Sequence, residues 1–452
     1  MYCFSGLDLQ PNAPLLARRI ADRPGAAWLW SNGSNPVSYL FCDPIAETDA
    51  LDPEPSLRFV RDCEGLNSLP RWLGLLPYEA FRAIERERWA VRPDERARPL
   101  VVHPRWWRYG AVAVVSDRVR VFGDEPTCVK ELSRRLSFPS SASVKCRFKA
   151  EPHDGEEAEH AQRINEALDH IRAGNIYQIN LARRFDFEVQ GHALDWLTGL
   201  GANAPSPFGF AVEAGGVRVV GTSPELCLWV SSTGCIITRP IKGTRPRGRT
   251  PEEDRSLIES LDRNAKEIAE LSMVIDLERN DLGKISEVGS VAVLDAGSIE
   301  THGPVHQRVA TLSAQARPEI DRRTILETFL PSGSVTGAPK VRAMELIARL
   351  ESTRRGLYTG AYGCIGHDGS MRLAMAIRTL VADVSGQGHY FAGGGIVADS
   401  IPQLELEETL WKTRHILEFV GTIPSGSFHH TRQLTLDRSN SKIYTGWSMD
   451  GR

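Results

Sequence analysis

The order in which helix-like and strand-like segments follow one another constrains the fold of this chain most strongly. Apolar side chains recur at helical spacing in four segments, namely residues 159–173, residues 252–277, a segment from Pro339, and a segment from Pro402 to about residue 420. Strand-like runs lie between them, at residues 177–185, 217–220, 235–238, 371–380 and 389–391. Because the two kinds of segment come in clusters and do not alternate as βαβ units, the sequence predicts an α+β fold with antiparallel sheets.

The patterned region defines a division of the chain. Residues 1–150 carry few chemical signatures, residues 151–423 contain the helices and strands described above, and residues 424–452 are polar. The total of 452 residues is enough for two to three domains of ordinary size. We expect residues 424–452 to form a loosely held C-terminal tail.

Composition excludes several classes of protein. The 54 Lys and Arg residues nearly balance the 57 Asp and Glu residues, so no basic surface for nucleic acid is expected. The best apolar run, residues 111–115, is far shorter than the roughly 20 residues of a membrane span. The N-terminus lacks a basic segment followed by an apolar one, and the eight cysteines form no C-x-x-C pair. We therefore expect a cytoplasmic protein with reduced thiols, no membrane association and no structural zinc.

A lysine beside a glycine is the first candidate for chemistry. Lys242 lies in the sequence RPIKGT at residues 239–244, directly after a strand-like run. Glycine lets the backbone approach a ligand closely, and a partly desolvated lysine can act as a nucleophile. A surface lysine in a turn is the simpler interpretation of this motif alone.

Acidic residues at helical spacing suggest a cation site. Glu270 and Glu267 share one face of the predicted helix over residues 252–277, and Glu405 and Glu408 share a face of the last helix with Lys412. Carboxylates suit a hard divalent cation, and the second pair could complete a site begun by Glu270. Solvated helix faces with intrahelical ion pairs are the alternative.

Two glycine-rich segments and one arginine suggest an anion site. The sequence GSVTGAPK at residues 333–340 leads into a helix, and its spacing is not that of a Walker A loop. Gly393, Gly394 and Gly395 follow a strand-like run and suggest backbone pressed against a ligand. Arg378 interrupts an apolar run, so it needs a carboxylate partner from the protein or from a substrate. Ordinary capping and a structural ion pair remain open as alternatives.

Taken together in order, these segments resemble the chorismate-binding enzymes over residues 158–422. The matching segments are Ser223-Pro224-Glu225, PIKGT, AKEIAELSMVIDLERND, GSVTGAPK, Tyr358 in GLYTGAYG, Arg378, and AGGGIVADS with its glutamates. The resemblance implies a large two-sheet antiparallel β-sandwich flanked by helices. It also implies that residues 1–150 are a variable N-terminal part that shares the fold, and that residues 151–423 form the chorismate-binding catalytic part.

Two positions relate the chain to particular members of this family. Lys242 corresponds to the nucleophilic lysine of component I of aminodeoxychorismate synthase, where anthranilate synthases and the water-adding members carry alanine. Gln178 stands where isochorismate and salicylate synthases carry a water-activating lysine. The resemblance therefore implies amination of chorismate at the position of its hydroxyl, giving 4-amino-4-deoxychorismate for 4-aminobenzoate and folate synthesis. An anthranilate synthase, a secondary-metabolite homologue and a non-catalytic chorismate binder are the alternatives.

The resemblance also implies a role for each candidate residue. Lys242 would add to the ring while Glu225 protonates the departing hydroxyl. The substrate would be held by groups that the motifs supply, namely Gln178, Thr244, Thr336, Tyr358, Arg378, Gly393, Gly394 and Gly395. Mg²⁺ would be held by Glu270 and Glu408, with Glu405 close by. Because the chain has no G-x-C-x-G motif, a separate glutaminase subunit would supply ammonia.

One segment departs from the family pattern. The family carries His-Leu-Val-Ser in a strand where this chain reads VHQRVAT at residues 305–311, which aligns Gln307 with the family's histidine. His306 is one residue away, and one residue along a strand reverses the face. Either a bulge brings His306 into the site, or the protein works without that histidine.

Overall fold

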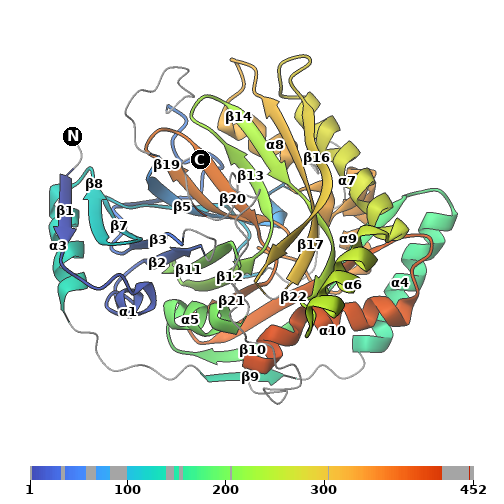
Figure 1. The fold of residues 1–452 in the computed structure, drawn as a ribbon, viewed down its shortest axis with the longest axis horizontal. Coiled ribbons are helices and arrows are strands. Elements are labelled where there is room, and N and C mark those ends of the chain that lie inside the picture. The colour runs from blue at the N-terminus through green and yellow to red at the C-terminus, as the bar shows by residue number, and fades with distance from the viewer. Residues whose placement is uncertain are drawn as a thin grey trace.

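Two large antiparallel sheets packed face to face dominate the structure (Figure 1). The computed structural model describes residues 3–31, 36–56, 68–81, 99–138, 147–151, 156–203, 206–303, 305–419 and residue 447. Helices flank the two sheets on their outer faces. The predicted α+β fold with a two-sheet sandwich is confirmed.

The larger sheet joins strands from the beginning and the end of the chain. Its 12 described strands include β9 (Arg147–Glu151), which pairs with β10 beside the main order. That order is β1 (Cys3–Leu7), β8 (Val119–Gly123), β7 (Ala111–Val115), β3 (Ser38–Phe41), β2 (Ala26–Trp30), β11 (Phe208–Ala214), β12 (Val217–Ser223), β21 (Thr379–Asp383), β22 (Gln387–Ile396), β10 (Gln178–Gln190) and β18 (Gly337–Ala338).

The smaller sheet also joins strands from the beginning and the end of the chain. Its 10 described strands include β16 (Ala292–His302), which forms a long hairpin with β17. The main order is β15 (Ile241–Pro246), β17 (Val305–Gln315), β14 (Cys235–Arg239), β13 (Leu226–Val230), β20 (Met371–Met375), β19 (Ala361–Gly366), β5 (Pro70–Leu76), β6 (Arg105–Arg108) and β4 (Ala46–Thr48). Strands β2 and β5 pair with β11 and β19, so the first 150 residues and the later part of the chain share both sheets.

Strand alternation builds the core in layers. On β2, Leu29 packs between the two sheets, whereas Trp28 packs under the helices of the larger sheet. On β19, Tyr362 faces the inter-sheet layer and Ile365 faces the helices of the smaller sheet. Successive side chains of a strand point to opposite faces, so both faces of these strands are apolar and buried.

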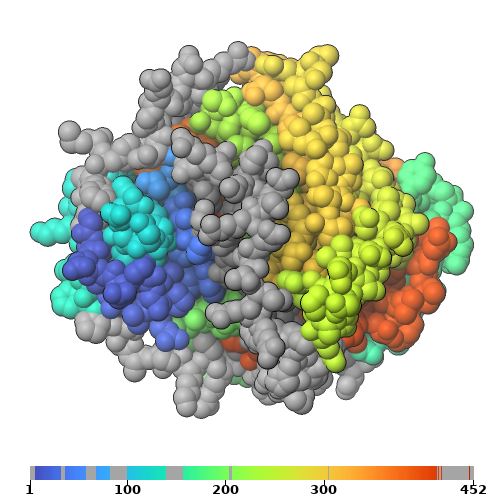
Figure 2. Space-filling view, viewed as in Figure 1, coloured from blue at the N-terminus to red at the C-terminus, as the bar shows by residue number. Residues whose placement is uncertain are grey.

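The helices cover the outer faces. The larger sheet is covered by α1 (Ala13–Arg18), α3 (Pro126–Ser137), α5 (Ala193–Asn203) and α10 (Pro402–Phe419), with α4 (Glu156–Arg172) and α9 (Lys340–Leu350) near β10. The smaller sheet is covered by α6 (Pro251–Asp262), α7 (Ala265–Gly283) and α8 (Arg322–Phe329). Figure 2 shows α10, in red, beside α4 at one edge of the molecule. None of the described helices is long and apolar enough to cross a membrane.

Two predicted elements are each divided in the structure. The helix expected over residues 252–277 is two helices, α6 and α7. Arg263 caps the end of the first, and Asn264 caps the start of the second by accepting a hydrogen bond of 3.0 Å from the Glu267 amide. The strand expected over residues 371–380 is broken, since β20 lies in the smaller sheet and β21 in the larger one. The chain crosses between them at Arg378, whose φ of 51° is left-handed.

One residue of the C-terminal segment is anchored in the core. Residues 424–452 lie outside the described residues apart from Trp447, which is 0% exposed. Its indole Nε1 donates to the Gly209 carbonyl at 2.7 Å, and its ring meets Phe208 edge to face at 5.5 Å. The expectation of a loosely held tail is therefore wrong at Trp447.

Replacing Trp447 by alanine should destabilise the protein. Loss of a fully buried tryptophan costs about 3–5 kcal/mol of unfolding free energy, which urea titration followed by circular dichroism can measure. Trp447→Phe keeps most of the ring and should lose much less. Trp411→Ala is the matched control because Trp411 is 59% exposed. Equal unfolding midpoints for Trp447→Ala and the wild type would contradict the anchoring role.

Candidate active site

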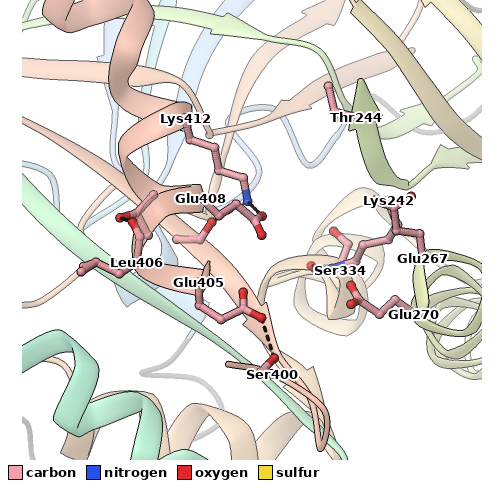
Figure 3. Close-up of polar contacts among 12 residues, drawn as sticks. Lys242, Thr244, Glu267, Glu270, Ser334, Ser400, Glu405, Leu406, Glu408 and Lys412 are labelled. Atoms are coloured by element: carbon pink, nitrogen blue, oxygen red, sulfur yellow. Dashed lines mark hydrogen bonds and ion pairs between the residues drawn. The ribbon is translucent and has the colours of Figure 1, made fainter. Parts of the chain in front are cut away.

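The candidate residues converge where β15, β22, α7, α10 and the η1 loop (Gly333–Val335) meet. Figure 3 shows Lys242, Ser334 and Glu270 on one side of this site and Glu405, Glu408 and Lys412 on the other. These residues come from segments as far apart as 242 and 412 in the sequence, so the fold alone brings them together.

A bulge in β15 positions the candidate nucleophile. The pairing of β15 with β17 shifts register between Lys242 and Thr244, and Gly243 between them has φ of +80°. A Cβ on Gly243 would lie 2.7 Å from Leu261 Cδ1, so no side chain fits there. Lys242 Nζ donates to the Ser334 carbonyl at 3.2 Å. Burial lowers the pKa of Lys242, with Glu270 acting in the opposite direction, and this favours a neutral amine.

The candidate general acid lies on the other side of Ser334. Glu225 follows β12 and is 5% exposed, and Ser334 Oγ donates to its Oε1 at 3.0 Å. Burial raises the pKa of Glu225 to about 7, although the Ser334 hydroxyl and the charge of Lys242 act against that rise. A carboxyl group with this pKa can hold and release a proton near neutral pH. Ser334 thus contacts both Lys242 and Glu225, and sequence reasoning did not single it out.

Three carboxylates face the glycine run of β22. A Cβ added to Gly394 would lie 3.4 Å from Glu405 Oε2 and 3.7 Å from Glu408 Oε1. A Cβ added to Gly395 would lie 3.7 Å from Glu270 Oε2. The missing side chains of the two glycines therefore leave the space between α7 and α10 that these carboxylates line.

Lysines balance these carboxylates in the structure. Lys266 Nζ is 3.2 Å from Glu405 Oε1 and 3.9 Å from Glu270 Oε1. Lys412 Nζ is 2.6 Å from Glu408 Oε1 and donates to the Gly393 carbonyl at 2.7 Å. Among the described residues, no three Asp, Glu, His or Cys side chains are arranged to hold a metal ion. Metal binding would need the carboxylates to leave their lysine partners.

A half-buried cation near the same site lacks an acidic partner. No hydrogen bond or ion pair joins the Arg378 guanidinium to any residue that the structure describes, and burial lowers the pKa of Arg378. Tyr358 stacks on Phe391 with ring centroids 5.2 Å apart, and its hydroxyl lies 2.8 Å from the position of a Cβ on Gly393. An arginine in this state is suited to a carboxylate brought by a ligand.

Several buried oxygen atoms of the described residues near the site also lack a hydrogen-bond donor. Within the described parts of the chain, Gln178 Oε1, Asn180 Oδ1, Thr222 Oγ1 and Gln307 Oε1 have no hydrogen-bond partner. Buried polar atoms are normally paired, so these four suit a ligand or water that donates hydrogen bonds. Asn180 and Thr222 were not predicted as site residues. Asn180 could have been, because it follows Gln178 by two positions on the same strand face.

The two threonines that were predicted to bind substrate differ in their surroundings. Thr244 is exposed, and Gln307 Nε2 donates to its hydroxyl at 3.4 Å. Thr336 is buried, and its hydroxyl donates to the Ser332 carbonyl at 2.9 Å. Thr244 is free to meet a ligand, whereas Thr336 holds the η1 loop together.

The structure does not bring His306 to the other site residues. His306 is 0% exposed, its Nδ1 lies 2.7 Å from Thr301 Oγ1, and its Nε2 lies 2.8 Å from Asp254 Oδ1. Gln307 instead pairs with Thr244 across the strands. The bulge between β15 and β17 lies at Gly243 and does not turn His306 toward Lys242.

A buried arginine that sequence reasoning missed ties the site together. Arg355 is 1% exposed and pairs with Glu351 at 2.7 Å. It also donates to the Asn180 carbonyl at 2.7 Å and to the Val335 carbonyl at 3.0 Å. One side chain therefore joins β10 and the η1 loop to the end of α9. The four-residue spacing of Glu351 and Arg355 could have predicted an ion pair, but it could not have predicted that the pair is buried.

Removing the partner of Arg355 should be costly. Glu351→Ala leaves a buried charge uncompensated, which typically costs about 3–5 kcal/mol of unfolding free energy. Chemical denaturation of the variant and of the wild type would measure the difference. Glu345→Ala is the control, because its pair with Arg342 is partly exposed and should contribute no more than about 1 kcal/mol. A similar small loss in both variants would refute the stabilising role of Arg355.

Comparisons with known proteins give a consistent family. A family model described as "chorismate binding enzyme" matches residues 25–418. Component 1 of anthranilate synthase from Thermus thermophilus is 40% identical over 302 residues, which is 65% of this chain and 64% of that protein. Component 1 of aminodeoxychorismate synthase from Bacillus subtilis is 39% identical over 253 residues, 56% of this chain and 53% of that protein. The chain thus spans about half to two thirds of the length of these curated relatives.

Solved structures agree with the fold. The structure of anthranilate synthase component I from Streptococcus pneumoniae covers 91% of both chains with a TM-score of 0.69 and 28% identity. The menaquinone-specific isochorismate synthase from Escherichia coli covers 93% of this chain and 94% of its own, with a TM-score of 0.72. At 16% identity the second likeness supports the fold alone.

Proposed function

Because this chain belongs to the chorismate-binding enzyme family, we propose that it aminates chorismate as component I of an aminodeoxychorismate synthase. The observation that carries the proposal is the position of Lys242, a half-buried amine that shares Ser334 with the protonatable Glu225. A nucleophile and a general acid on either side of one loop residue are what a two-step displacement requires. The relatives include synthases of both aminodeoxychorismate and anthranilate, so their names do not decide between the two products.

The first step would form a covalent intermediate on Lys242. The neutral Lys242 amine bonds to a ring carbon of chorismate, the bond between ring and hydroxyl breaks, and Glu225 gives its proton to the departing oxygen. Water leaves, Glu225 becomes a carboxylate, and the lysine nitrogen carries a positive charge. The lowered pKa of Lys242 and the raised pKa of Glu225 both favour the starting protonation states.

The second step would release Lys242. Ammonia bonds to the ring where the hydroxyl had been, and the bond to Lys242 breaks so that the lysine leaves as a neutral amine. The product nitrogen keeps the positive charge as an ammonium group. Glu225 remains a carboxylate and must regain one proton before the next turnover.

Binding of the substrate would rest on groups that lack a partner in the structure. Chorismate carries two carboxylates, and the Arg378 guanidinium could take one of them, beside the Tyr358 hydroxyl and the Gly393–Gly395 backbone. The unpaired oxygens of Gln178 and Asn180 could accept hydrogen bonds from a hydroxyl or from ammonia.

The carboxylates between α7 and α10 fit a divalent cation by chemistry, because all three offer oxygen ligands beside two glycines. Glu270 and Glu408, with Glu405, would hold Mg²⁺. When bound, the ion would neutralise a substrate carboxylate that otherwise faces three acidic side chains. Lys266 and Lys412 currently take that balancing role.

A separate glutaminase subunit would supply ammonia. The chain has no G-x-C-x-G segment of its own. The relatives named as components 1 are consistent with a second component. Free ammonium salts should replace the partner in an assay.

The second candidate is an anthranilate synthase, which the names of several relatives favour. The residue at Lys242 argues against it, because the family resemblance assigns alanine to that position in anthranilate synthases. The identity of the product distinguishes an aminodeoxychorismate synthase from an anthranilate synthase.

Incubation with chorismate, Mg²⁺ and ammonium should give 4-amino-4-deoxychorismate, trapped by a lyase as 4-aminobenzoate. Mass spectrometry of the quenched protein should reveal a chorismate-derived adduct on Lys242. Lys242→Ala should lose the adduct, and Glu225→Gln should lower kcat by about 10²–10⁴-fold. Lys130→Ala is the control, since Lys130 is exposed on α3. Formation of anthranilate, or equal background rates in wild type and Lys242→Ala, would refute the proposal.

Chelation should remove the activity, and Mg²⁺ should restore it. Glu408→Gln deletes one charged ligand, so the Mg²⁺ concentration needed for half-maximal rate should rise by roughly 10-fold or more, by analogy with losses seen around other metal ligands. Glu407→Gln is the matched control, because Glu407 is exposed on the same helix. The same Mg²⁺ dependence in both variants would exclude Glu408 as a ligand.

A further inference from the structure

A second buried carboxyl group is connected to Glu225 by two serine hydroxyls. Ser334 Oγ lies 3.0 Å from Glu225 Oε1, Ser332 Oγ lies 3.1 Å from Ser334 Oγ, and Ser332 Oγ lies 2.9 Å from Glu278 Oε1. Each step is within hydrogen-bond distance. Glu278 lies on α7, and the proposed chemistry gives it no part.

The whole path is closed to solvent. Glu278 and Ser332 are each 1% exposed, Ser334 is 4% exposed and Glu225 is 5% exposed. Burial raises the pKa of Glu278 to about 8, although Ser332 opposes the rise, and the nearby Glu225 adds to it. Both ends of the path can therefore carry a proton at neutral pH.

Among the described residues, the two serines are the only side chains whose hydrogen bonds connect Glu278 to the site. Thr238 Oγ1 on β14 donates to Glu278 Oε2 at 3.0 Å. Cys227 on β13 lies close enough for a charge on Glu278 to raise the pKa of its thiol. Asp281, one turn along α7, is paired with Lys340 and Lys284, so its charge is balanced. No basic side chain among the described residues pairs directly with Glu278.

We propose that Glu278 is a proton store for Glu225 and exchanges one proton with it through the hydroxyls of Ser332 and Ser334. This inference rests on the proposed function, because it concerns how the general acid of that reaction is reprotonated. Glu278 touches no substrate group and would act only through Glu225. Glu278 thus supplies a proton to the general acid and is not itself a catalytic residue.

The transfer balances without any further reactant. After the first chemical step Glu225 is a carboxylate and Glu278 is protonated. Glu278 gives its proton to Ser332 Oγ, Ser332 gives its own proton to Ser334 Oγ, and Ser334 gives its own proton to Glu225 Oε1. Three O–H bonds break and three form, Glu225 becomes neutral, and Glu278 becomes the carboxylate. When the site opens, a proton from water reaches Glu225 and the same path runs in reverse.

The heavy-atom distances suit both directions. The three contacts differ by only 0.2 Å between 2.9 and 3.1 Å, so rotation of two hydroxyls is the only change needed. Ser332 also accepts from the Ser334 amide at 3.1 Å, which holds the two hydroxyls side by side. A purely structural cluster would need neither titratable end.

Glu278→Gln tests the store because glutamine keeps the shape and the hydrogen bonds but cannot carry the proton. The first turnover, measured as adduct on Lys242, should stay within about threefold of the wild type, because Glu225 starts protonated. Steady-state kcat should fall by roughly 10-fold or more, since each later turnover waits for a proton from solvent. The alkaline limb of the kcat profile should change from a two-proton to a one-proton decline.

Two further variants separate the path from simple loss of structure. Ser332→Ala breaks the path while both carboxyl groups remain, and it should reproduce the kinetics of Glu278→Gln, with no added loss in the double variant. Thr238→Val is the matched control, because it removes a contact of Glu278 that lies off the path. The control should keep the two-proton decline. Wild-type kcat in both path variants, or equal losses of adduct and turnover, would overturn the proposal.

Infrared titration keeps the two proposals distinguishable. The protonated carboxyl bands of the wild type should disappear together between about pH 6 and pH 9, and Ser332→Ala should separate them. If the wild type forms no adduct but shows this coupled titration, the reaction assignment fails and the proton path stands. If the adduct forms and the two carboxyl groups titrate independently, the path fails and the reaction assignment stands.

Discussion

The site depends first on the buried guanidinium of Arg355. A charge taken out of water is tolerated only when its hydrogen bonds are satisfied, and Arg355 is satisfied by Glu351, by Thr359 and by backbone carbonyls of two other segments. Those segments are β10 and the η1 loop. The requirement to satisfy one cation therefore fixes the distance between the strand with Gln178 and the loop with Ser334.

The η1 loop, which Arg355 holds in place, in turn positions the groups proposed to react. Ser334 uses its carbonyl for Lys242 and its hydroxyl for Glu225, and Ser332 continues to Glu278. Two acids with raised pKa values and one lysine with a lowered pKa thus share a single short loop. Burial is the common cause, since it penalises every charged form, and it favours neutral proton donors beside a neutral nucleophile.

Local pattern was enough to predict α4, α9 and α10 and parts of β10, β12, β14 and β22, but not α1, α3, α5 and α8, and not where the chain changes sheet. Arg378 was expected inside one strand because residues 371–380 are apolar, yet it lies where the chain leaves β20 for β21. Both strands are buried on both faces, so composition alone does not reveal the crossing. The charges around Arg355 and the burial of Trp447 were equally hidden, because their partners lie far away in the sequence.

The near balance of charge in the sequence has a counterpart in the site. Glu270, Glu405 and Glu408 face a dianionic ligand in the proposed reaction, so they need cations in either state of the site. Lys266 and Lys412 serve in the structure as it stands, and Lys412 also holds the Gly393 carbonyl. In the structure the charge of Lys412 lowers the pKa of Lys242, although Lys412 is also paired with Glu408. One lysine thus balances a carboxylate of the site and favours the neutral form of the nucleophile.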